Sequence, residues 1–289
     1  MNCKICCQNT EKIFNKKILL KYDVSYFRCS KCFFIQTEEP YWLEEAYGLG
    51  AIGALDVGIM SRNLMLVNKT ELIADKLFSS LSNFSGVDYG GGHGIFVRMM
   101  RDQGFNFYRQ DLYAENLYAR YFDVNDLPLN TKYNILTAFE VLEHLPNPIE
   151  EIKKMFMYAD ILLFSTELQL SNEISELEKW WYIVPEGGQH VSFYNDLTFR
   201  EIERILNVNY YTDFNNIHIL SKKNLPENPF LNLEIKIGKK KNILQRIIVK
   251  IINKLNCFNP QLPIDDVKLK SLTNVDFEFV KQKIRTHGN

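Results

Sequence analysis

Five of the six cysteines lie within the first 32 residues, and four of these form two C-x-x-C pairs. The pairs, Cys3 with Cys6 and Cys29 with Cys32, are separated by 22 residues. Such pairs do not persist as structural disulfides in a reducing cytosol. Each instead forms a tight turn that offers two thiolates, and two turns complete a closed tetrahedral Zn(II) site. The spacing favours one structural zinc ion over a redox pair or ordinary core cysteines, with Cys7 as a spare thiol.

A glycine-rich turn forms the second chemical cluster, with the pattern Asp88-x-Gly90-x-Gly92-x-Gly94 between a predicted strand and a predicted helix. Glycines in such a turn let the backbone approach a ligand closely. In open α/β sheets, ligands bind at the carboxyl ends of the strands. A G-x-G-x-x-G dinucleotide fingerprint would need a small residue at position 95, where Ile95 stands.

Two aspartates follow the glycine turn at the ends of the next two predicted strands. Asp111, 23 residues after Asp88, can accept hydrogen bonds from both ribose hydroxyls. Asp123 is placed to meet an adenine amino group. Together with the turn, these carboxylates favour a nucleoside cofactor over a merely structural glycine turn.

The elements that must position these residues alternate between strands and helices. We predict strands at 86–89, 106–110, 119–123, 133–139, 161–166, 210–214 and 217–221, and helices at 62–81, 95–103 and 196–206. Short ribbon strands are expected around 18–20 and 26–27. This alternation indicates βαβ units and a mainly parallel sheet.

Three stretches carry a resemblance to a known family: residues 87–111, residues 122–128, and the run FEVLEHLPNP at 139–148. Over about residues 40–222 the chain resembles a class I S-adenosylmethionine-dependent methyltransferase. The paired cysteines and the run GQHVSFY at 188–194 resemble a narrower group, the zinc-containing sugar and nucleotide-sugar methyltransferases of deoxysugar and polysaccharide pathways. Only 67 residues follow position 222, too few for the large extra domain of the sugar C-methyltransferases, so O-methylation is at least as well supported as C-methylation.

The resemblance implies an α/β, Rossmann-like sheet that is mostly parallel with an antiparallel last strand. It divides the chain into a zinc-ribbon module at 1–40, a methyltransferase domain at 41–224, and a linker with a helical tail at 225–289.

The resemblance also assigns cofactor contacts. Arg62 could pair with the cofactor carboxylate or simply be a solvated helix arginine, and Phe139 could be core instead of a contact. The implied S-adenosylmethionine contacts are Gly90, Gly92 and Gly94 to the methionine and ribose, Asp88 to the amino end, Asp111 to the ribose, Asp123 to the adenine, and Phe139 and Glu140 to the methionine portion.

Histidine is the expected base, because the pKa of an unperturbed imidazole lies near physiological pH. His190, in a loop after the fifth strand, is the predicted general base, and His144, after the fourth strand, is its rival. His93 and His218 are interpreted as structural, and the aromatic run at 180–182 as either a stacking surface for an acceptor or a buried lid.

Composition and net charge limit the kinds of protein and partner that fit this chain. The chain of 289 residues has 46% hydrophobic residues, which excludes a disordered chain, and its formal net charge of -1 argues against a protein that coats nucleic acid. The predicted function is methylation of a carbohydrate, nucleotide sugar or surface-polysaccharide precursor. The alternatives are an RNA methyltransferase whose basic ribbon contacts phosphates, which the acidic residues just after the ribbon disfavour, and a non-enzymatic scaffold.

Residues 236–255 form a basic amphipathic pattern, which predicts a helix that packs on the catalytic domain or on a second subunit, or that contacts an anionic membrane. No apolar run approaches the roughly 18 residues of a membrane span, and the first residues lack the apolar core of a signal peptide. A cytoplasmic protein, with a homodimer as one option, is expected.

Overall fold

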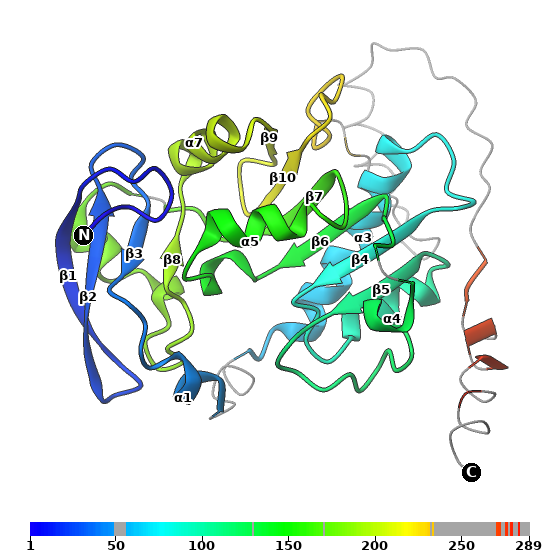
Figure 1. Ribbon diagram of the computed structural model, residues 1–289, viewed down its shortest axis with the longest axis horizontal. Coiled ribbons are helices and arrows are strands. Elements are labelled where there is room, and N and C mark those ends of the chain that lie inside the picture. Colours follow the sequence, from blue (N-terminus) through cyan, green and yellow to red (C-terminus); the bar gives the residue numbers. More distant parts are fainter. Residues whose placement is uncertain are drawn as a thin grey trace, which may run out of the picture.

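The computed structural model describes residues 1–48, 56–128, 130–169, 171–231, 233, 270–272, 275–276, 278–279 and 283. Its described strands form two sheets (Figure 1). The larger sheet has six strands in the order β5-β4-β6-β7-β10-β9, and the smaller has four in the order β1-β2-β3-β8.

The larger sheet is mostly parallel. Its strands are β4 (Ser85–Tyr89), β5 (Asn106–Gln110), β6 (Ile135–Phe139), β7 (Ile161–Ser165), β9 (Asn209–Thr212) and β10 (Ile217–Ser221). Strands β5, β4, β6 and β7 pair in parallel, whereas β10 runs antiparallel to both β7 and β9. The predicted mostly parallel sheet with an antiparallel last strand is confirmed. Every residue of β7 and β10 is buried, as expected for strands covered on both faces.

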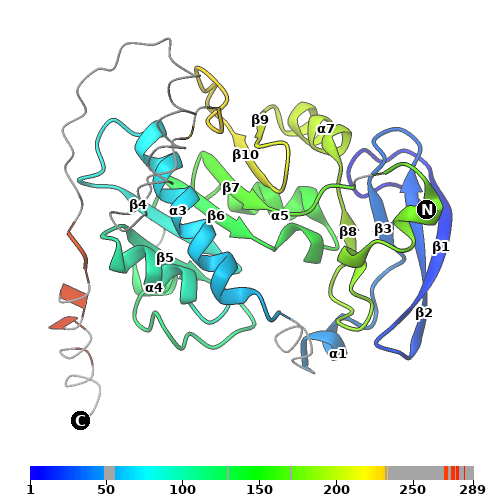
Figure 2. The same cartoon turned by 180° about the vertical axis from the view of Figure 1, so that it is seen from behind.

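Helices cover the two faces of this sheet (Figures 1 and 2). One face packs against α3 (Ile59–Leu77) and α4 (Ile95–Asp102), through Val67, Phe96 and Met100 among others. The other packs against α5 (Pro148–Met155) and α7 (Asp196–Leu206). Helices on both faces of a mainly parallel sheet give the doubly wound, Rossmann-like architecture that the sequence predicts.

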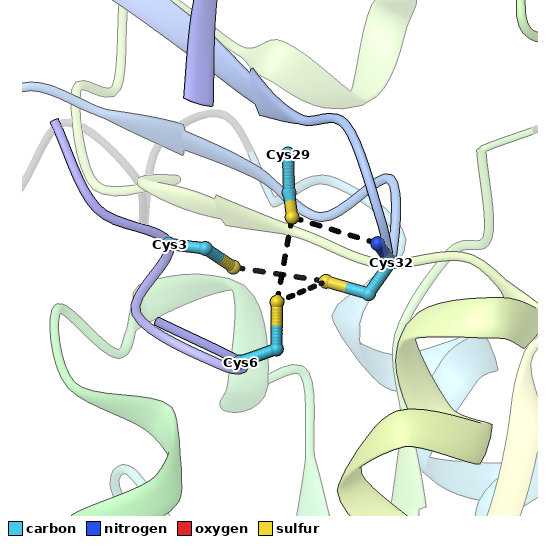
Figure 3. A group of neighbouring side chains, drawn as sticks. All are labelled: Cys3, Cys6, Cys29 and Cys32. Atoms are coloured by element: carbon cyan, nitrogen blue, oxygen red, sulfur yellow. Dashed lines mark hydrogen bonds between the residues drawn. The ribbon is translucent and has the colours of Figure 1, made fainter. Parts of the chain in front are cut away.

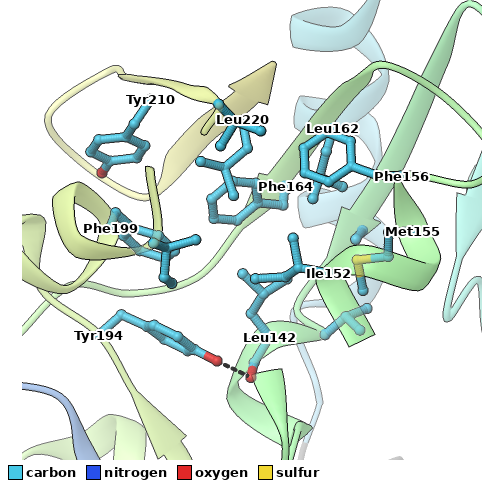
Figure 4. Close-up of a cluster of buried hydrophobic side chains, with 14 of the residues drawn as sticks. Leu142, Ile152, Met155, Phe156, Leu162, Phe164, Tyr194, Phe199, Tyr210 and Leu220 are labelled. Carbon is cyan, nitrogen blue, oxygen red and sulfur yellow. Dashed lines mark hydrogen bonds between the residues drawn. The ribbon is translucent and has the colours of Figure 1, made fainter. Parts of the chain in front are cut away.

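The core under α5 and α7 extends to Leu142, which follows β6 (Figure 4). Ile152 of α5 and Phe199 of α7 are fully buried in it. Tyr194 belongs to the same cluster, and its hydroxyl donates a hydrogen bond of 2.8 Å to the carbonyl oxygen of Leu142. This core thereby connects α7 with the segment that follows β6.

The smaller sheet is completed by a distant segment. Strands β1 (Thr10–Ile18), β2 (Tyr22–Cys29) and β3 (Ile35–Thr37) form an antiparallel N-terminal unit, and β8 (Ser192–Phe193) pairs with β3. The expectation of strand around 18–20 is wrong at Leu19 and Leu20, whose φ values of 52° and 57° make them the tight turn of the β1–β2 hairpin.

The predicted strand at 119–123 is also wrong. A single bridge, between Arg109 and Asp123, replaces it, and Tyr121 has a φ of 68°. The side chain of Asn116 accepts from the backbone N–H of Ala119 at 2.9 Å and donates to its carbonyl at 2.7 Å, so it holds a turn there. Side-chain bonds to the backbone compete here with strand pairing.

Short helices make most of the remaining connections. They are α1 (Leu43–Gly48), α6 (Ile174–Leu177), η1 (Val124–Asp126), η2 (Leu142–His144) and η3 (Trp181–Ile183). Within the described chain, no helix is both long and apolar enough to cross a bilayer. The predicted amphipathic helix at 236–255 lies outside the described residues. Further on, the buried Asp276 accepts two hydrogen bonds of 2.8 Å from Arg101 of α4.

Candidate active site

The glycine turn connects β4 to α4 at the carboxyl edge of the sheet. Gly90, Gly92 and Gly94 have φ values of 68°, 54° and 86°, which side chains rarely adopt. A Cβ on Gly90 would lie 2.7 Å from Val141, whereas a Cβ on Gly92 would meet nothing within 4 Å. Packing therefore requires Gly90, while the open space beside Gly92 is where a ligand can approach the backbone.

Asp88 lies beneath the turn. Its Oδ1 accepts a hydrogen bond of 2.6 Å from the Thr137 hydroxyl, and a Cβ on Gly91 would lie 2.8 Å from its Oδ2. Burial raises the pKa of Asp88 to about 7. The carboxyl group thus supports the loop from below, and its contact with the amino end of a cofactor stays a prediction.

Asp111 lies beside Gly92, just beyond the end of β5. Its Oδ2 accepts from the Gly92 N–H at 2.9 Å. Its Oδ1 accepts from the N–H groups of Tyr113 and Ala114 at 2.8 Å and 2.7 Å. A carboxylate with about four lone-pair positions keeps some acceptor capacity for a ribose. The predicted juxtaposition of Asp111 with the glycine turn is present in the structure.

Asp123 is engaged by protein donors instead. Its Oδ1 accepts from Arg109 Nε at 2.7 Å, and its Oδ2 accepts from the Asn116 amide at 2.8 Å. Arg109 also donates to the carbonyl oxygens of Gly92 and Ala114, and so ties the turn to the following loop. The adenine role of Asp123 stays a prediction, and the contacts present in the structure hold the loop in place.

Phe139 and Glu140 end β6 beside the turn. Phe139 is partly buried and packs edge-on against Phe96 of α4, with ring centroids 5.1 Å apart. Glu140 has a φ of 53°, and its Oε1 accepts from Ser165 at 2.5 Å. Arg62 pairs with Asp56 at 2.5 Å and keeps 31% of its side chain exposed, so its contact with a cofactor carboxylate stays a prediction.

The two candidate bases lie together. His144, at the end of η2, and His190, just before β8, have ring centroids 4.9 Å apart. Glu143 adds a carboxylate, with its Oε1 4.0 Å from His144 Nε2. We call Glu143, His144 and His190 the acid–imidazole cluster; one potential ligand atom from each lies within 4.8 Å of the others.

Burial sets the ionisation of this cluster. It lowers the pKa of His190 to about 4 and the pKa of His144 well below its usual value. Burial also raises the pKa of Glu143, and the negative charge of Glu140 raises it further. Both imidazoles are therefore neutral near pH 7, and each keeps one nitrogen lone pair.

The place of His190 depends on the N-terminal sheet. Its Nδ1 lies 2.6 Å from the carbonyl oxygen of Tyr182, which fixes the tautomer with the lone pair on Nε2. Next to it, Trp42 Nε1 donates to the Gly188 carbonyl at 2.7 Å, and the Val191 N–H donates to the Glu143 carbonyl at 2.8 Å. The loop is thereby held between Trp42, which follows β3, and η2.

The remaining histidines and the aromatic run occupy separate places. His93 lies exposed in the glycine turn, whereas His218 is buried on β10 and bonds to Thr212 and the Thr166 carbonyl. Of the run at 180–182, Tyr182 is buried against His190, with ring centroids 4.7 Å apart, while Trp181 is 67% exposed. Trp180 is partly buried, so the run divides into a core residue, a partly buried residue and a surface residue.

The four-cysteine cluster is Cys3, Cys6, Cys29 and Cys32 (Figure 3). Sulfur separations are 3.4 Å for Cys6–Cys29 and 3.6 Å for both Cys3–Cys32 and Cys6–Cys32. Tetrahedral Zn–S bonds of about 2.3 Å place sulfurs about 3.8 Å apart, so the donor set fits a zinc ion. The two cysteine turns have the same backbone geometry. In the first, Cys7 has a φ of 60° and its N–H donates to the Cys3 carbonyl. In the second, Phe33 has a φ of 58° and its N–H donates to the Cys29 carbonyl.

The profile of the methyltransferase domain family matches residues 63–207, from α3 to the end of α7. The chain belongs to this family. The match covers the glycine turn, Asp111 and the acid–imidazole cluster. The methyltransferase part of the resemblance is thereby confirmed, while the zinc-containing sugar subtype stays a prediction.

Solved structures show weaker similarity. One is the magnesium protoporphyrin IX methyltransferase of Synechocystis PCC 6803 with bound SAH, at 20% identity over 57% of this chain and 82% of that chain, with a TM-score of 0.38. Another is a possible histamine N-methyltransferase of Thermotoga maritima, at 14% identity over 57% of this chain and 95% of that chain, with a TM-score of 0.38. A third is the plantazolicin methyltransferase in complex with SAH, at 12% identity over 63% of this chain and 96% of that chain, with a TM-score of 0.37. Among curated proteins, no sequence matches the chain.

Sequence reasoning assigned no role to Arg109 or Glu143, and it considered Tyr182 only as part of the aromatic run at 180–182. Arg109 is a charged residue inside an otherwise short buried strand, which is a usable signal. Glu143 lies in the run at 139–148, but only the fold reveals that it is completely buried. Tyr182 orients His190 through its backbone carbonyl, which no side-chain pattern reports.

Proposed function

We propose that this chain is an S-adenosylmethionine-dependent methyltransferase that methylates a carbohydrate, a nucleotide sugar or a surface-polysaccharide precursor, at oxygen or carbon. One observation carries the proposal. Two neutral, buried imidazoles lie beside the end of β6, on the same sheet edge as the glycine turn and Asp111. Such an edge is where doubly wound sheets bind ligands.

The cofactor would be held by the turn and its neighbours. Gly92 presents backbone to open space, and Asp111 keeps acceptor capacity for the ribose hydroxyls. Phe139 and Glu140 would face the methionine portion, as the resemblance implies. When bound, S-adenosylmethionine supplies an electrophilic methyl group.

His190 would remove the acceptor proton. Its Nδ1 is engaged by the Tyr182 carbonyl, so Nε2 carries the lone pair that can accept a proton from a hydroxyl. Because its pKa is lowered to about 4, the base is deprotonated at physiological pH. His144 would orient the acceptor or take the same role, since its ring lies beside that of His190.

An aromatic surface adjoins the imidazoles and suits a sugar ring. Tyr47 stacks on Tyr113 with centroids 4.8 Å apart and an interplanar angle of 9°, and its hydroxyl lies 3.5 Å from His144 Nδ1. Tyr113 is 76% exposed. Aromatic faces with a polar tip pack against ligands that are apolar on one face and hydroxylated at the rim.

The ribbon favours this proposal over the RNA alternative. Three of the lysines that could contact phosphates pair with carboxylates at 3.4 Å or less: Lys4 with Glu39, Lys21 with Glu45 and Lys31 with Glu201. Paired cations attract a phosphate backbone less than free ones. The ribbon is proposed instead to hold a structural Zn(II) ion in the four-cysteine cluster.

Labelled S-adenosylmethionine, incubated with a panel of nucleotide sugars and capsule precursors, tests the proposal. His190→Ala should lower turnover about 10²–10⁴-fold and leave cofactor affinity within a few-fold of the parent. His144→Ala is the paired comparison, and the affinity of each variant for S-adenosylhomocysteine is the folding control. If His190→Ala keeps near-parental turnover while His144→Ala is inactive, the base is His144. If no acceptor in the panel is methylated but an RNA is, the alternative function replaces this one.

A further inference from the structure

Glu143 is an unusual residue of this site. Its side chain is completely buried, and neither carboxylate oxygen accepts a hydrogen bond of normal geometry, although the hydroxyls of Tyr182 and Thr166 lie close enough to oppose the rise in its pKa. An unpaired buried carboxyl group costs several kcal/mol unless it stays protonated or meets a cation. A completely buried carboxyl group beside two imidazoles, with no hydrogen bond of normal geometry, indicates a missing partner.

One potential ligand nitrogen from each of the two imidazoles lies within 4.8 Å of a Glu143 carboxylate oxygen. His144 Nε2 lies 4.0 Å from Glu143 Oε1, and the Nε2 lone pair of His190 is left free by the bond from Nδ1 to Tyr182. Imidazoles that bind metals are typically held in this way, with the other ring nitrogen bonded to a carbonyl or carboxylate. Tyr47, 3.5 Å from His144 Nδ1, provides a similar contact for the second ring.

We infer that Glu143, His144 and His190 bind a divalent transition-metal cation, at a site separate from the four-cysteine cluster. Two atoms that each lie about 2.1 Å from one ion are at most about 4.2 Å apart, so the present separations of up to 4.8 Å need only small side-chain rotations.

The donor set selects the class of ion. Two imidazoles and one carboxylate suit Mn(II), Fe(II), Co(II) or Zn(II), and leave coordination positions open for further oxygen ligands. Magnesium prefers oxygen donors alone. The four thiols of the other cluster favour zinc, so the two sites would hold different ions when both metals are supplied.

A bound cation would change the use of His190. The lone pair on Nε2 cannot hold a metal and accept a proton together, so the proton acceptor of the proposed function would act only in the metal-free protein. When bound, the cation would supply polarisation of an acceptor hydroxyl, whose proton would then pass to water instead of to His190. This extension rests on the proposed function, whereas the metal site itself does not.

Manganese binding is the direct test. The full-length protein is treated with a chelator, its four-cysteine cluster is refilled with one equivalent of zinc, and Mn(II) is titrated while the EPR signal of free Mn(II) is recorded. We expect about one Mn(II) per chain and a rise in melting temperature. Glu143→Gln keeps the size of the side chain and removes its charge, so binding should weaken at least 100-fold. His190→Ala should do the same.

Glu150→Gln is the matched control, because Glu150 is an exposed carboxylate on α5 whose partner is Lys153. It should bind Mn(II) as the parent does. If the parent protein binds no Mn(II), or if Glu143→Gln binds it unchanged, the inference is wrong. Affinity for S-adenosylhomocysteine, measured on the same samples, distinguishes this failure from a failure of the proposed function.

Discussion

The four-cysteine cluster and the acid–imidazole cluster are both groups of metal-capable side chains, yet they are built in opposite ways. The first comes from two local turns, in which backbone N–H groups of Ile5, Lys31 and Cys32 bond to the sulfurs of Cys3 and Cys29. The second joins η2 to a loop 46 positions after His144, and its carboxylate accepts no hydrogen bond of normal geometry. Local turns form their own support, whereas a cluster made by tertiary contacts depends on everything that holds its segments together.

The two regions are physically connected through β8. This strand pairs with β3 of the N-terminal sheet, and it begins two residues after His190. The Thr37 N–H also donates to the Val191 carbonyl at 3.1 Å. Damage to the first region should therefore reach the second, which the following predictions test.

Cys29→Ser should have the largest effect. Loss of one thiolate from a closed zinc site removes much of the folding energy that the ion supplies. We expect bound zinc to fall from about one per chain to near zero, and turnover to fall at least about 100-fold because β3 no longer holds the His190 loop. Affinity for S-adenosylmethionine should stay within a few-fold. Metal analysis, limited proteolysis and calorimetry measure these quantities.

Cys7→Ser is the matched control, since Cys7 is exposed and lies outside the cluster. It should keep its zinc and its turnover. Parental turnover in zinc-free Cys29→Ser would show that the two regions are independent.

The pH dependence of catalysis should separate a buried base from an exposed one. An ordinary histidine is about three-quarters protonated at pH 6. With its pKa lowered to about 4, His190 stays neutral there, so kcat/KM should be nearly flat from pH 8 to pH 6 and fall only on approach to pH 4 to 5. An acid limb centred near 6.5, measured on folded protein, would contradict this assignment.

His218 separates the effect of burial from the effect of the cluster, because its pKa is also lowered by burial to about 4. Its folded pKa lies below the unfolded one, so the unfolded chain binds more protons and stability is lost as pH falls from about 6.5 towards 4. His218→Gln should therefore lose about 2 kcal/mol less stability than the parent between pH 8 and pH 5. Urea unfolding of both proteins at pH 8 and at pH 5 measures the difference. Equal losses of unfolding free energy in the parent and the variant would argue against a lowered pKa of His218.

Ser192→Ala should have the smallest effect. The Ser192 hydroxyl donates to the Leu145 carbonyl at 2.6 Å, and this bond links β8 to the segment after η2. Its removal should cost about 1 kcal/mol of unfolding free energy. Ser30→Ala, on an exposed hydroxyl that bonds at 3.4 Å, should cost less. If the two variants are equally stable, the link between the regions does not depend on this hydroxyl.

Much of the fold was predictable from the sequence because its signals are local. The ranges 106–110, 196–206 and 217–221 match β5, α7 and β10, since apolar runs and an Asn195 cap mark them in the chain itself. The range 119–123 failed because Asn116 and Tyr121 impose turns through side-chain bonds and a positive φ, which an apolar pattern does not reveal.

The sequence by itself determined the four-cysteine cluster and the glycine turn, because each is set by spacing over a few residues. It also named Asp111 and both candidate bases. Only the tertiary structure decided that Arg109 and Asn116 bond to the carboxylate of Asp123, and that Glu143 is completely buried beside two imidazoles. The physical reason is that burial and hydrogen-bond occupancy depend on which distant segments pack together, and β8 joins the N-terminal sheet to the site across more than 150 positions.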